Sequence, residues 1–449
     1  MSAALPSPTR FGAAPPLRGV VRVPGDESIS HRALMLSALA VGESRIEGLP
    51  ESVDVLATAA AMRTLGADVV RDQDGTWRVH GVGVGGLLQP RTAVDVRGSE
   101  TSARLLMGLL TSHPVTAAIT GDAALSRQSM EDVIEPLSRM GADFTTSPGG
   151  RLPLMLRGAC PAVPIEYRLP VASAGVKSAV LFAALNAPGI IRVIEPTPAR
   201  DHSERMLRGF GADLVVEHVG GERIISLHGE AELRPQRIVV PGTPSLAALL
   251  VVAALIVPGS AVTIENVGLN PTRAGLFEVL RAMGADIRVT NQRDVAGEPV
   301  ADLMACHSAM RGIEVPAEIA PSMIDEFPIL FVAGAFAVGR TVTRGLHGLR
   351  SGHADRLAVM AEGLRAAGAR VEEREDGLVV DGTGGDLLPG GATVATAPDH
   401  RLAMSFAVAG LRSRAPIGID HMAPAAVGIP WLAEILTSLA GEKLRDEAA

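Results

Sequence analysis

The chain has 449 residues, of which 47% are hydrophobic and 20% charged, so it is too long for one core and too apolar for a disordered protein. Acidic residues outnumber basic ones by 49 to 41, and the net charge of −8 excludes a general polyanion binder. Aromatic residues make up only 3%, which also argues against a base-stacking surface for nucleic acid. We therefore expect two or three domains with aliphatic cores and no nucleic-acid partner.

The sequence also bears on the cellular compartment. Residues 1–18 lack a basic segment followed by an apolar one, so no secretory signal is expected. The longest apolar run, 246–257, is far shorter than the roughly 20 residues needed to cross a bilayer. The two cysteines, Cys160 and Cys306, are typical of free thiols in a reducing compartment. We expect a cytoplasmic protein that makes no membrane contact.

Along the chain, a tag of glycine, alanine and an acidic residue closes one amphipathic segment after another. It begins at Gly66, Gly141, Gly211 and Gly284, and weaker forms begin at Gly368 and Gly441. Glycine just after the last helical turn is the expected helix stop. Short β-like runs follow the tag, for example at 67–70 and 285–289. The tag therefore indicates an internal repeat of roughly 70 residues.

A second helix, more apolar than the first, is predicted in each repeat. Its six copies start near Ser28, Thr101, Ser173, Ser245, Ser322 and Asp399. All six residues carry a hydroxyl or carboxylate, the usual chemistry of a helix N-cap. The body of one copy, 246–255, is apolar on nearly every side, which predicts a buried helix. A β-rich run such as 259–265 follows, so the chain reads as six βαβαββ repeats.

Six repeats that each bury one helix predict an α/β fold of two halves with three repeats each. Buried helices that share one direction would point the positive ends of their dipoles toward the cleft between the halves. Such a cleft suits a small anionic substrate despite the negative net charge.

Five segments resemble signatures of the 5-enolpyruvylshikimate-3-phosphate (EPSP) synthase family. They are 24–32, 172–178, 195–202, 321–328 and 399–404, and the similarity runs from about residue 18 to 440. The resemblance implies the enolpyruvyl transferase fold, which consists of two inverse α/β domains with three repeats in each. We expect one domain to span 1–24 plus 243–449 and the other 25–242, with the active site in the cleft between them.

The resemblance also implies an activity. The family transfers the enolpyruvyl group of phosphoenolpyruvate to the 5-hydroxyl of shikimate 3-phosphate without a metal or cofactor. Relatives that use a UDP-sugar acceptor carry a reactive cysteine in a loop that falls near 110–130. This chain has no cysteine there, which favours a shikimate-type ligand.

The positions that match the shikimate-phosphate site are intact. The resemblance implies that Ser28 and Arg32 hold the ring, and that Ser173, Ala174 and Arg200 bind its 3-phosphate. A serine at a helix N-terminus with an arginine opposite is physically suited to a phosphate. Asp325 matches a carboxylate that contacts the ring hydroxyls and is a proposed base. The structural alternative is that Ser28, Ser173 and Asp325 only cap helices.

The positions that match the phosphoenolpyruvate site differ from the family motifs. The differing residues are Glu27, Glu100, Gln128, Gly175, Gly352 and His353. Arg356 and Arg401 match the arginines that bind the donor carboxylate. Glu27 stands where the family has a lysine, and a charge pair 4 Å apart is worth about 4 kcal/mol at an effective dielectric constant near 20. Alternatively, Glu27 turns outward and Arg127 replaces the arginine that the family has at position 128.

These differences lead to a first hypothesis, a phosphate-eliminating lyase that acts on shikimate 3-phosphate or a close analogue. A base among Glu27, Glu100, His353 and Asp325 would remove a C6 proton while the C3 phosphate leaves. This 1,4-elimination would give a cyclohexadiene carboxylate. We would expect such a reaction in secondary metabolism. Arg356 or Arg401 would hold the ring carboxylate or stabilise the developing enolate.

Two alternatives remain open. One is a 3-phosphoshikimate 1-carboxyvinyltransferase with a rebuilt donor site, and the other is a non-catalytic shikimate-phosphate sensor. We expect no cofactor and no metal, because the glycine-rich run 81–86 opens no helix and the histidines lack paired metal-ligand spacing. We also expect a monomer.

Overall fold

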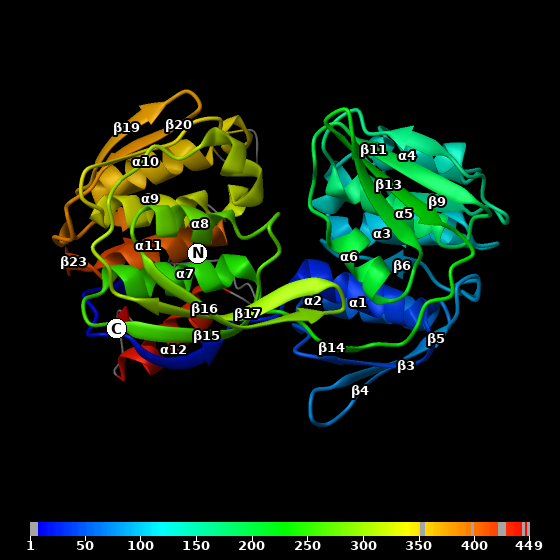
Figure 1. Cartoon of the computed structure of the whole chain (residues 1–449), viewed down its shortest axis with the longest axis horizontal. Helices are drawn as coiled ribbons and strands as arrows, with labels where there is room; N and C mark the ends of the chain where they lie inside the picture. Colours follow the sequence, from blue (N-terminus) through cyan, green and yellow to red (C-terminus); the bar gives the residue numbers. More distant parts are fainter. Residues whose placement is uncertain (1–7, 351–354, 397–398, 421–427, 442–444, 447–449) are drawn as a thin grey trace, which may run out of the picture. The chain divides into compact units, whose positions relative to one another are not determined.

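The chain folds into two α/β units, and the computed structural model describes residues 8–350, 355–396, 399–420, 428–441 and 445–446. Unit 1 comprises Met1–Pro24, Gly242–Arg293 and Val300–Ala449, and unit 2 comprises Gly25–Pro241 and Asp294–Pro299. Each unit has its own hydrophobic core, built almost wholly from aliphatic side chains. Within each unit, central helices lie among sheets (Figure 1). The predicted α/β fold is confirmed.

Unit 2 contains three four-stranded sheets with the same pattern of pairing. In each sheet one edge pair is parallel and the other pairs are antiparallel, so one βαβαββ arrangement occurs three times. In sheet order, the strands are β14 (Arg237–Val239), β3 (Val41–Glu47), β5 (Trp77–Val82) and β4 (Asp68–Arg71); β6 (Val94–Asp95), β7 (Thr116–Thr120), β9 (Arg151–Arg157) and β8 (Asp143–Ser147); β10 (Glu166–Arg168), β11 (Ile190–Glu195), β13 (Glu222–His228) and β12 (Leu214–Val219).

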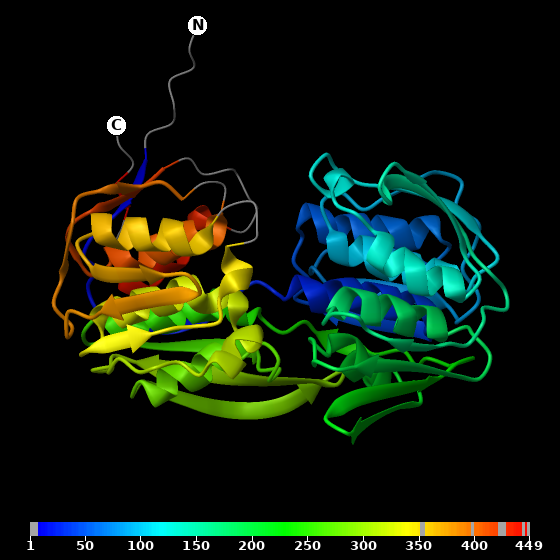
Figure 2. The same ribbon diagram turned by 90° about the horizontal axis from the view of Figure 1, so that it is seen from above.

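Each repeat of unit 2 carries one inner helix that is buried along most of its length and one outer helix. The inner helices are α1 (Glu27–Leu39), α3 (Glu100–Thr111) and α5 (Ala174–Ala184). The outer helices are α2 (Val53–Thr64), α4 (Glu131–Arg139) and α6 (His202–Gly209), and the short 3-10 helix η1 spans Leu125–Arg127. Helix α3 packs on α5, and both α1 and α5 contact α6. Figure 2 shows these helices from a second direction, packed beside the green strands of the third sheet.

Unit 1 repeats this plan less regularly. Its sheets, in strand order, are β16 (Asp286–Val295), β17 (Glu298–Cys306), β15 (Ala261–Gly268) and β2 (Arg18–Arg22); β18 (Arg340–Val342), β20 (Gly377–Asp381) and β19 (Arg370–Arg374); β22 (Thr393–Val394), β24 (Ile417–Ile419), β1 (Thr9–Phe11) and β25 (Arg445–Asp446); β21 (Leu388–Gly390) and β23 (Ser413–Ala415). The second sheet has three strands and the last has only two, so the repeat is recognisable mainly from the helices.

The inner helices of unit 1 pack against one another and form the centre of its core. They are α7 (Pro244–Ile256), α9 (Phe327–Phe336) and α11 (His400–Gly410). The outer helices are α8 (Gly275–Ala282), α10 (Arg356–Ala366) and α12 (Ile429–Ala440), and 3-10 helices span Ala317–Ser322 (η2), Ile324–Glu326 (η3) and His347–Leu349 (η4). Within the described residues, no helix is both long and apolar enough to cross a membrane.

Five of the six predicted inner helices begin within one residue of the expected position. The start near Ser322 is wrong, because α9 begins at Phe327 after the two 3-10 helices η2 and η3. Pro321 lies inside η2 and Pro328 is the second residue of α9, and proline lacks the N–H that a continuous helix needs. The irregular segment places Asp325 immediately before α9.

Candidate functional site

The N-terminus of α5 has the geometry of an anion-binding helix end. The side-chain oxygen of Ser173 accepts a hydrogen bond from the backbone N–H of Val176 at 3.2 Å, which caps the helix. Ala174 and Gly175 form the first turn, and both are half-buried. The first N–H groups of a helix have no intrahelical acceptors and lie at the positive end of its dipole. The turn that follows Ser173 can therefore present N–H donors to an anion.

Arg32 ties three helices of unit 2 together. Its guanidinium donates to the Ser28 carbonyl at 2.8 Å, to Ser203 Oγ at 2.8 Å and to Ser178 Oγ at 3.1 Å. Ser203 and Ser178, on α6 and α5, are themselves joined by a hydrogen bond of 2.8 Å. The side chain of Arg32 is buried, so the predicted ligand residues Ser28 and Arg32 also hold α1 against the other two helices.

Arg200 lies in the segment between β11 and α6, and it is half-buried. Burial lowers the pKa of Arg32 to about 10, and the positive charge of Arg200 acts in the same direction, whereas Glu204, Glu298 and Asp26 oppose it. Arg32 therefore keeps its proton at neutral pH, and the guanidinium of Arg200 is close enough to act on it electrostatically. The structure thus brings Ser28, Arg32 and Arg200 into one neighbourhood of unit 2, where α1 and α5 both contact α6.

A second cluster lies in unit 1 around Asp325. Its carboxylate oxygen lies 3.9 Å from Arg356 Nη1 and 3.6 Å from Arg401 Nη2. Arg356 also donates to Asp399 at 2.6 Å, and Asp399 caps α11 by accepting the backbone N–H groups of Arg401 and Leu402. The structure thus places the predicted base beside both predicted carboxylate-binding arginines. Sequence analysis missed Asp399 as the partner of Arg356, although its position as a helix start is evident from the sequence.

Four of the differing donor positions lie in unit 2. Glu27 is exposed at the first residue of α1, and Gln128 is half-buried at the end of η1. Glu100 forms an ion pair of 2.9 Å with Arg104, which also donates to Asp132 at 2.7 Å. The other two positions, Gly352 and His353, lie outside the described residues.

Gly175 is explained by its neighbour. A Cβ atom at this position would lie 2.7 Å from Cδ of Arg104, so any larger side chain would require Arg104 to move. Arg104 is nearly buried and runs alongside the first turn of α5. Because of this contact, a cationic side chain lies near Ser173, which the sequence pattern alone does not indicate.

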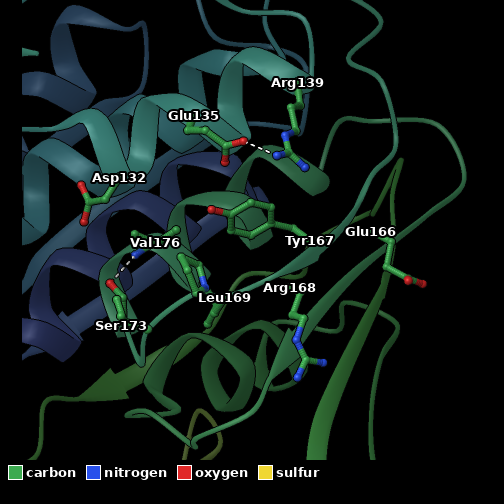
Figure 3. Close-up of a pocket in the computed structure, with 11 residues that line it drawn as sticks. Asp132, Glu135, Arg139, Glu166, Tyr167, Arg168, Leu169, Ser173 and Val176 are labelled. Atoms are coloured by element: carbon green, nitrogen blue, oxygen red, sulfur yellow. Dashed lines mark hydrogen bonds and ion pairs between the residues drawn. The ribbon is translucent and has the colours of Figure 1, made fainter.

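A pocket of about 500 Å³ opens beside Ser173. Figure 3 shows Glu135 and Arg139 of α4 pointing toward each other next to Tyr167 of β10. Burial, followed by a hydrogen bond to the Glu135 side chain, raises the pKa of Tyr167 to about 12, so the phenol is neutral. Ser173 is the one predicted site residue among the side chains that line the pocket. Sequence analysis did not predict the other lining residues, although three of them, 166–168, form a short strand shortly before Ser173.

The described part of the chain contains no group of three or more His, Cys, Asp or Glu side chains that could hold a metal ion. Both cysteines are free thiols: Cys160 is exposed in a loop, and Cys306 lies at the end of β17.

Comparison with known proteins assigns the chain to a family. Residues 13–436 match the family model described as EPSP synthase (3-phosphoshikimate 1-carboxyvinyltransferase). A protein of that enzyme name from Sphingopyxis alaskensis is 63% identical, with 96% of this chain and 98% of the relative covered. Its namesake from Novosphingobium aromaticivorans is 61% identical over 96% of this chain and 99% of the relative.

Solved structures agree with the fold. The EPSP synthase of Acinetobacter baumannii matches with a TM-score of 0.89 and 40% identity, covering 98% of this chain and 99% of that one. The enolpyruvyl transferase NikO of Streptomyces tendae matches with a TM-score of 0.72, over 97% and 98% of the two chains. At 21% identity, the second likeness shows the fold alone.

These comparisons overturn the lyase hypothesis. The relatives that share 52–63% of their residues with this chain carry the name of a carboxyvinyltransferase, so the predicted phosphate elimination and its place in secondary metabolism are wrong. The likeness also gives no support to the loss of the donor site that we inferred from Glu27, Glu100, Gln128 and Gly175. The inference of a lost donor site failed because it compared a few side chains with family motifs. Most of the sequence is identical to that of the named carboxyvinyltransferases.

Proposed function

Because the chain belongs to the EPSP synthase family, we propose that it transfers the carboxyvinyl group of phosphoenolpyruvate to the 5-hydroxyl of shikimate 3-phosphate. The observation that carries this proposal is the 63% identity to a 3-phosphoshikimate 1-carboxyvinyltransferase over 96% of the chain. The reaction forms a C–O bond at the enol carbon of the donor and releases inorganic phosphate. It is a step of the shikimate pathway.

Unit 2 would bind the phosphorylated ring. The 3-phosphate would accept hydrogen bonds from Ser173 and from the first N–H groups of α5, while Arg200 neutralises its charge. Ser28 and Arg32 would hold the ring, and Arg32 would do so with part of its hydrogen-bonding capacity already used by the protein. The position of Arg200 supports this assignment, because its positive charge acts on Arg32 and a bound dianion would offset that repulsion.

Unit 1 would serve the reacting groups. Asp325 would accept the proton of the 5-hydroxyl, since its carboxylate is only partly buried and is therefore accessible to a bound ligand. Arg356 and Arg401 would bind the carboxylate of phosphoenolpyruvate. From unit 2, Arg127, which is exposed at the end of η1, would supply the cation for the donor phosphate. A shared cleft between the domains, a monomeric state and a cytoplasmic location stay predictions.

Phosphorus NMR tests the proposal. The protein is incubated with shikimate 3-phosphate, with phosphoenolpyruvate, and with both, and we expect inorganic phosphate only when both are present. Phosphate released from shikimate 3-phosphate alone, or calorimetric binding without turnover, would contradict the proposal. In the Arg200→Ala variant, KM for shikimate 3-phosphate should rise roughly 10- to 100-fold, because the variant loses a charge-assisted hydrogen bond to phosphate.

A further inference from the structure

Lys177 is completely buried in unit 2, one turn after Ser173 on α5. It is one of only two lysines in the sequence. Its ammonium nitrogen lies 2.8 Å from Glu195 Oε1 and 2.9 Å from Glu204 Oε1. A buried ionic cluster of this kind costs free energy to desolvate, and apolar side chains of the same size often serve a core equally well. Because apolar side chains could fill the same space, we looked for a second role of this cluster in the contacts that it makes.

The cluster balances its charges and joins four elements of unit 2. Arg223 of β13 contacts Glu195 at 2.9 Å and Glu204 at 3.1 Å, so two cations face two carboxylates. Glu195 ends β11, Glu204 lies on α6 and Lys177 lies on α5. All four side chains are nearly or fully buried. The segment 196–201, which carries Arg200, is therefore fixed at both of its ends.

Two members of the cluster also hold the backbone inside that segment. Lys177 Nζ donates to the carbonyl of Ala199 at 3.3 Å, and the N–H of Ala199 donates to Glu195 Oε1 at 3.2 Å. Both polar backbone groups of Ala199 are thus bound by one ion pair. Ala199 immediately precedes Arg200, so this contact restricts the direction in which the guanidinium of Arg200 can point.

We propose that Lys177 and Glu195 are positioning residues for the phosphate of the ring substrate. Lys177 sits four residues after Ser173 on the same helix, so α5 supplies the phosphate-binding turn and also holds the residue before Arg200. The ion pair keeps the two halves of the phosphate site at a constant separation. This inference rests on the proposed function, which supplies the phosphorylated ligand.

The test removes the pair as a whole. In the Lys177→Met/Glu195→Gln double variant no buried charge is left unpaired, since Glu204 keeps Arg223, and the introduced glutamine can still accept from the N–H of Ala199. We expect KM for shikimate 3-phosphate to rise roughly tenfold or more, because a small misplacement of a binding group costs up to about 100-fold. The values of kcat and of KM for phosphoenolpyruvate should stay within about twofold.

The control is Arg78→Met/Asp72→Asn, which removes a half-buried ion pair of 2.8 Å from another sheet of unit 2. It should leave both KM values unchanged. A double variant that folds and keeps its KM for shikimate 3-phosphate, or one that loses kcat and both affinities together, overturns the proposal. If the double variant does not fold, Glu195→Gln alone should show the same selective rise in KM.

Calorimetric titration with shikimate 3-phosphate separates this proposal from the proposed function. Binding that weakens roughly tenfold in the double variant supports positioning even if no carboxyvinyl transfer is found. A wild-type protein that does not bind shikimate 3-phosphate overturns it, because Arg200 would then have no phosphate to meet.

Discussion

Glu27 is the first residue of α1, and its side chain is exposed. A carboxylate there interacts favourably with the positive end of the helix dipole, which gives it a structural reason to be present. If the donor phosphate binds nearby, Glu27→Lys should lower KM for phosphoenolpyruvate roughly two- to fivefold, since exposed charge pairs are worth about 1 kcal/mol or less. Steady-state kinetics at low ionic strength measures the change.

The matched control for that charge reversal is Glu278→Lys. Glu278 is an exposed carboxylate in the first turn of α8, so the same substitution meets the same kind of helix end, and no predicted donor residue lies on that helix. It should leave KM for phosphoenolpyruvate unaltered. Equal responses of the two variants would mean that Glu27 does not face the donor.

At the level of elements, the cap of α5 should matter for stability and for binding. Ser173→Ala removes the side-chain acceptor for Val176 and should cost about 1 kcal/mol of unfolding free energy. Ser52→Ala removes the corresponding cap from α2, where Ser52 accepts from Val55 at 3.4 Å, and should destabilise to a similar degree. Only the first variant should raise KM for shikimate 3-phosphate. Urea unfolding and kinetics on both variants check this, and a rise in KM for Ser52→Ala would contradict it.

His31 joins the inner helices α1 and α3 to the outer helix α2. Its Nδ1 lies 2.7 Å from Thr58 Oγ1, and its Nε2 lies 3.1 Å from Ser99 Oγ, the cap of α3. Burial, followed by the charge of Arg32, lowers the pKa of His31 to about 4, so the folded protein holds a neutral imidazole. The hydroxyl groups around it are matched to that neutral form.

A pH dependence of stability follows from this shift. Between pH 6.5 and 4 the unfolded chain binds a proton at His31 that the folded protein does not, so stability falls as the pH is lowered through that range. The loss should approach about 3 kcal/mol. Urea unfolding at pH 4.5 and 7.5 should show a smaller difference for His31→Asn than for the wild type. The same substitution at the exposed His228 should leave the difference as it is in the wild type.

At the level of the whole molecule, the two units have separate hydrophobic cores that share no residue. The chain has two tryptophans, Trp77 in unit 2 and Trp431 in unit 1. The variants Trp77→Phe and Trp431→Phe therefore each leave one fluorescent probe in one unit. Because two-state behaviour is typical of single domains, we expect different urea midpoints for the two probes. Calorimetry of the wild type should give a calorimetric enthalpy larger than the van't Hoff value. Coincident curves and equal enthalpies would show that the units unfold as one.

Local chemistry made much of the fold predictable. The apolar stretch 246–255 and the capping residues Ser173 and Asp399 mark helices α7, α5 and α11, because burial on all sides and N-cap hydrogen bonds are local properties. The start of α9 could not be found in this way. Glu326, the last residue of η3, is buried and accepts a hydrogen bond from Ser245 at the start of α7, a contact that no local pattern indicates.

The sequence by itself determined the repeated α/β fold and the family, because these follow from periodicity, capping and motif, and it predicts the residues that would bind a phosphate. Only the tertiary structure decided which side chains meet. It placed Asp325 beside Arg356 and Arg401, laid Arg104 against Gly175, and enclosed Lys177 between Glu195 and Glu204. Such contacts join residues far apart in the chain. They arise when helices and strands pack and bury charge, and no local pattern specifies that step.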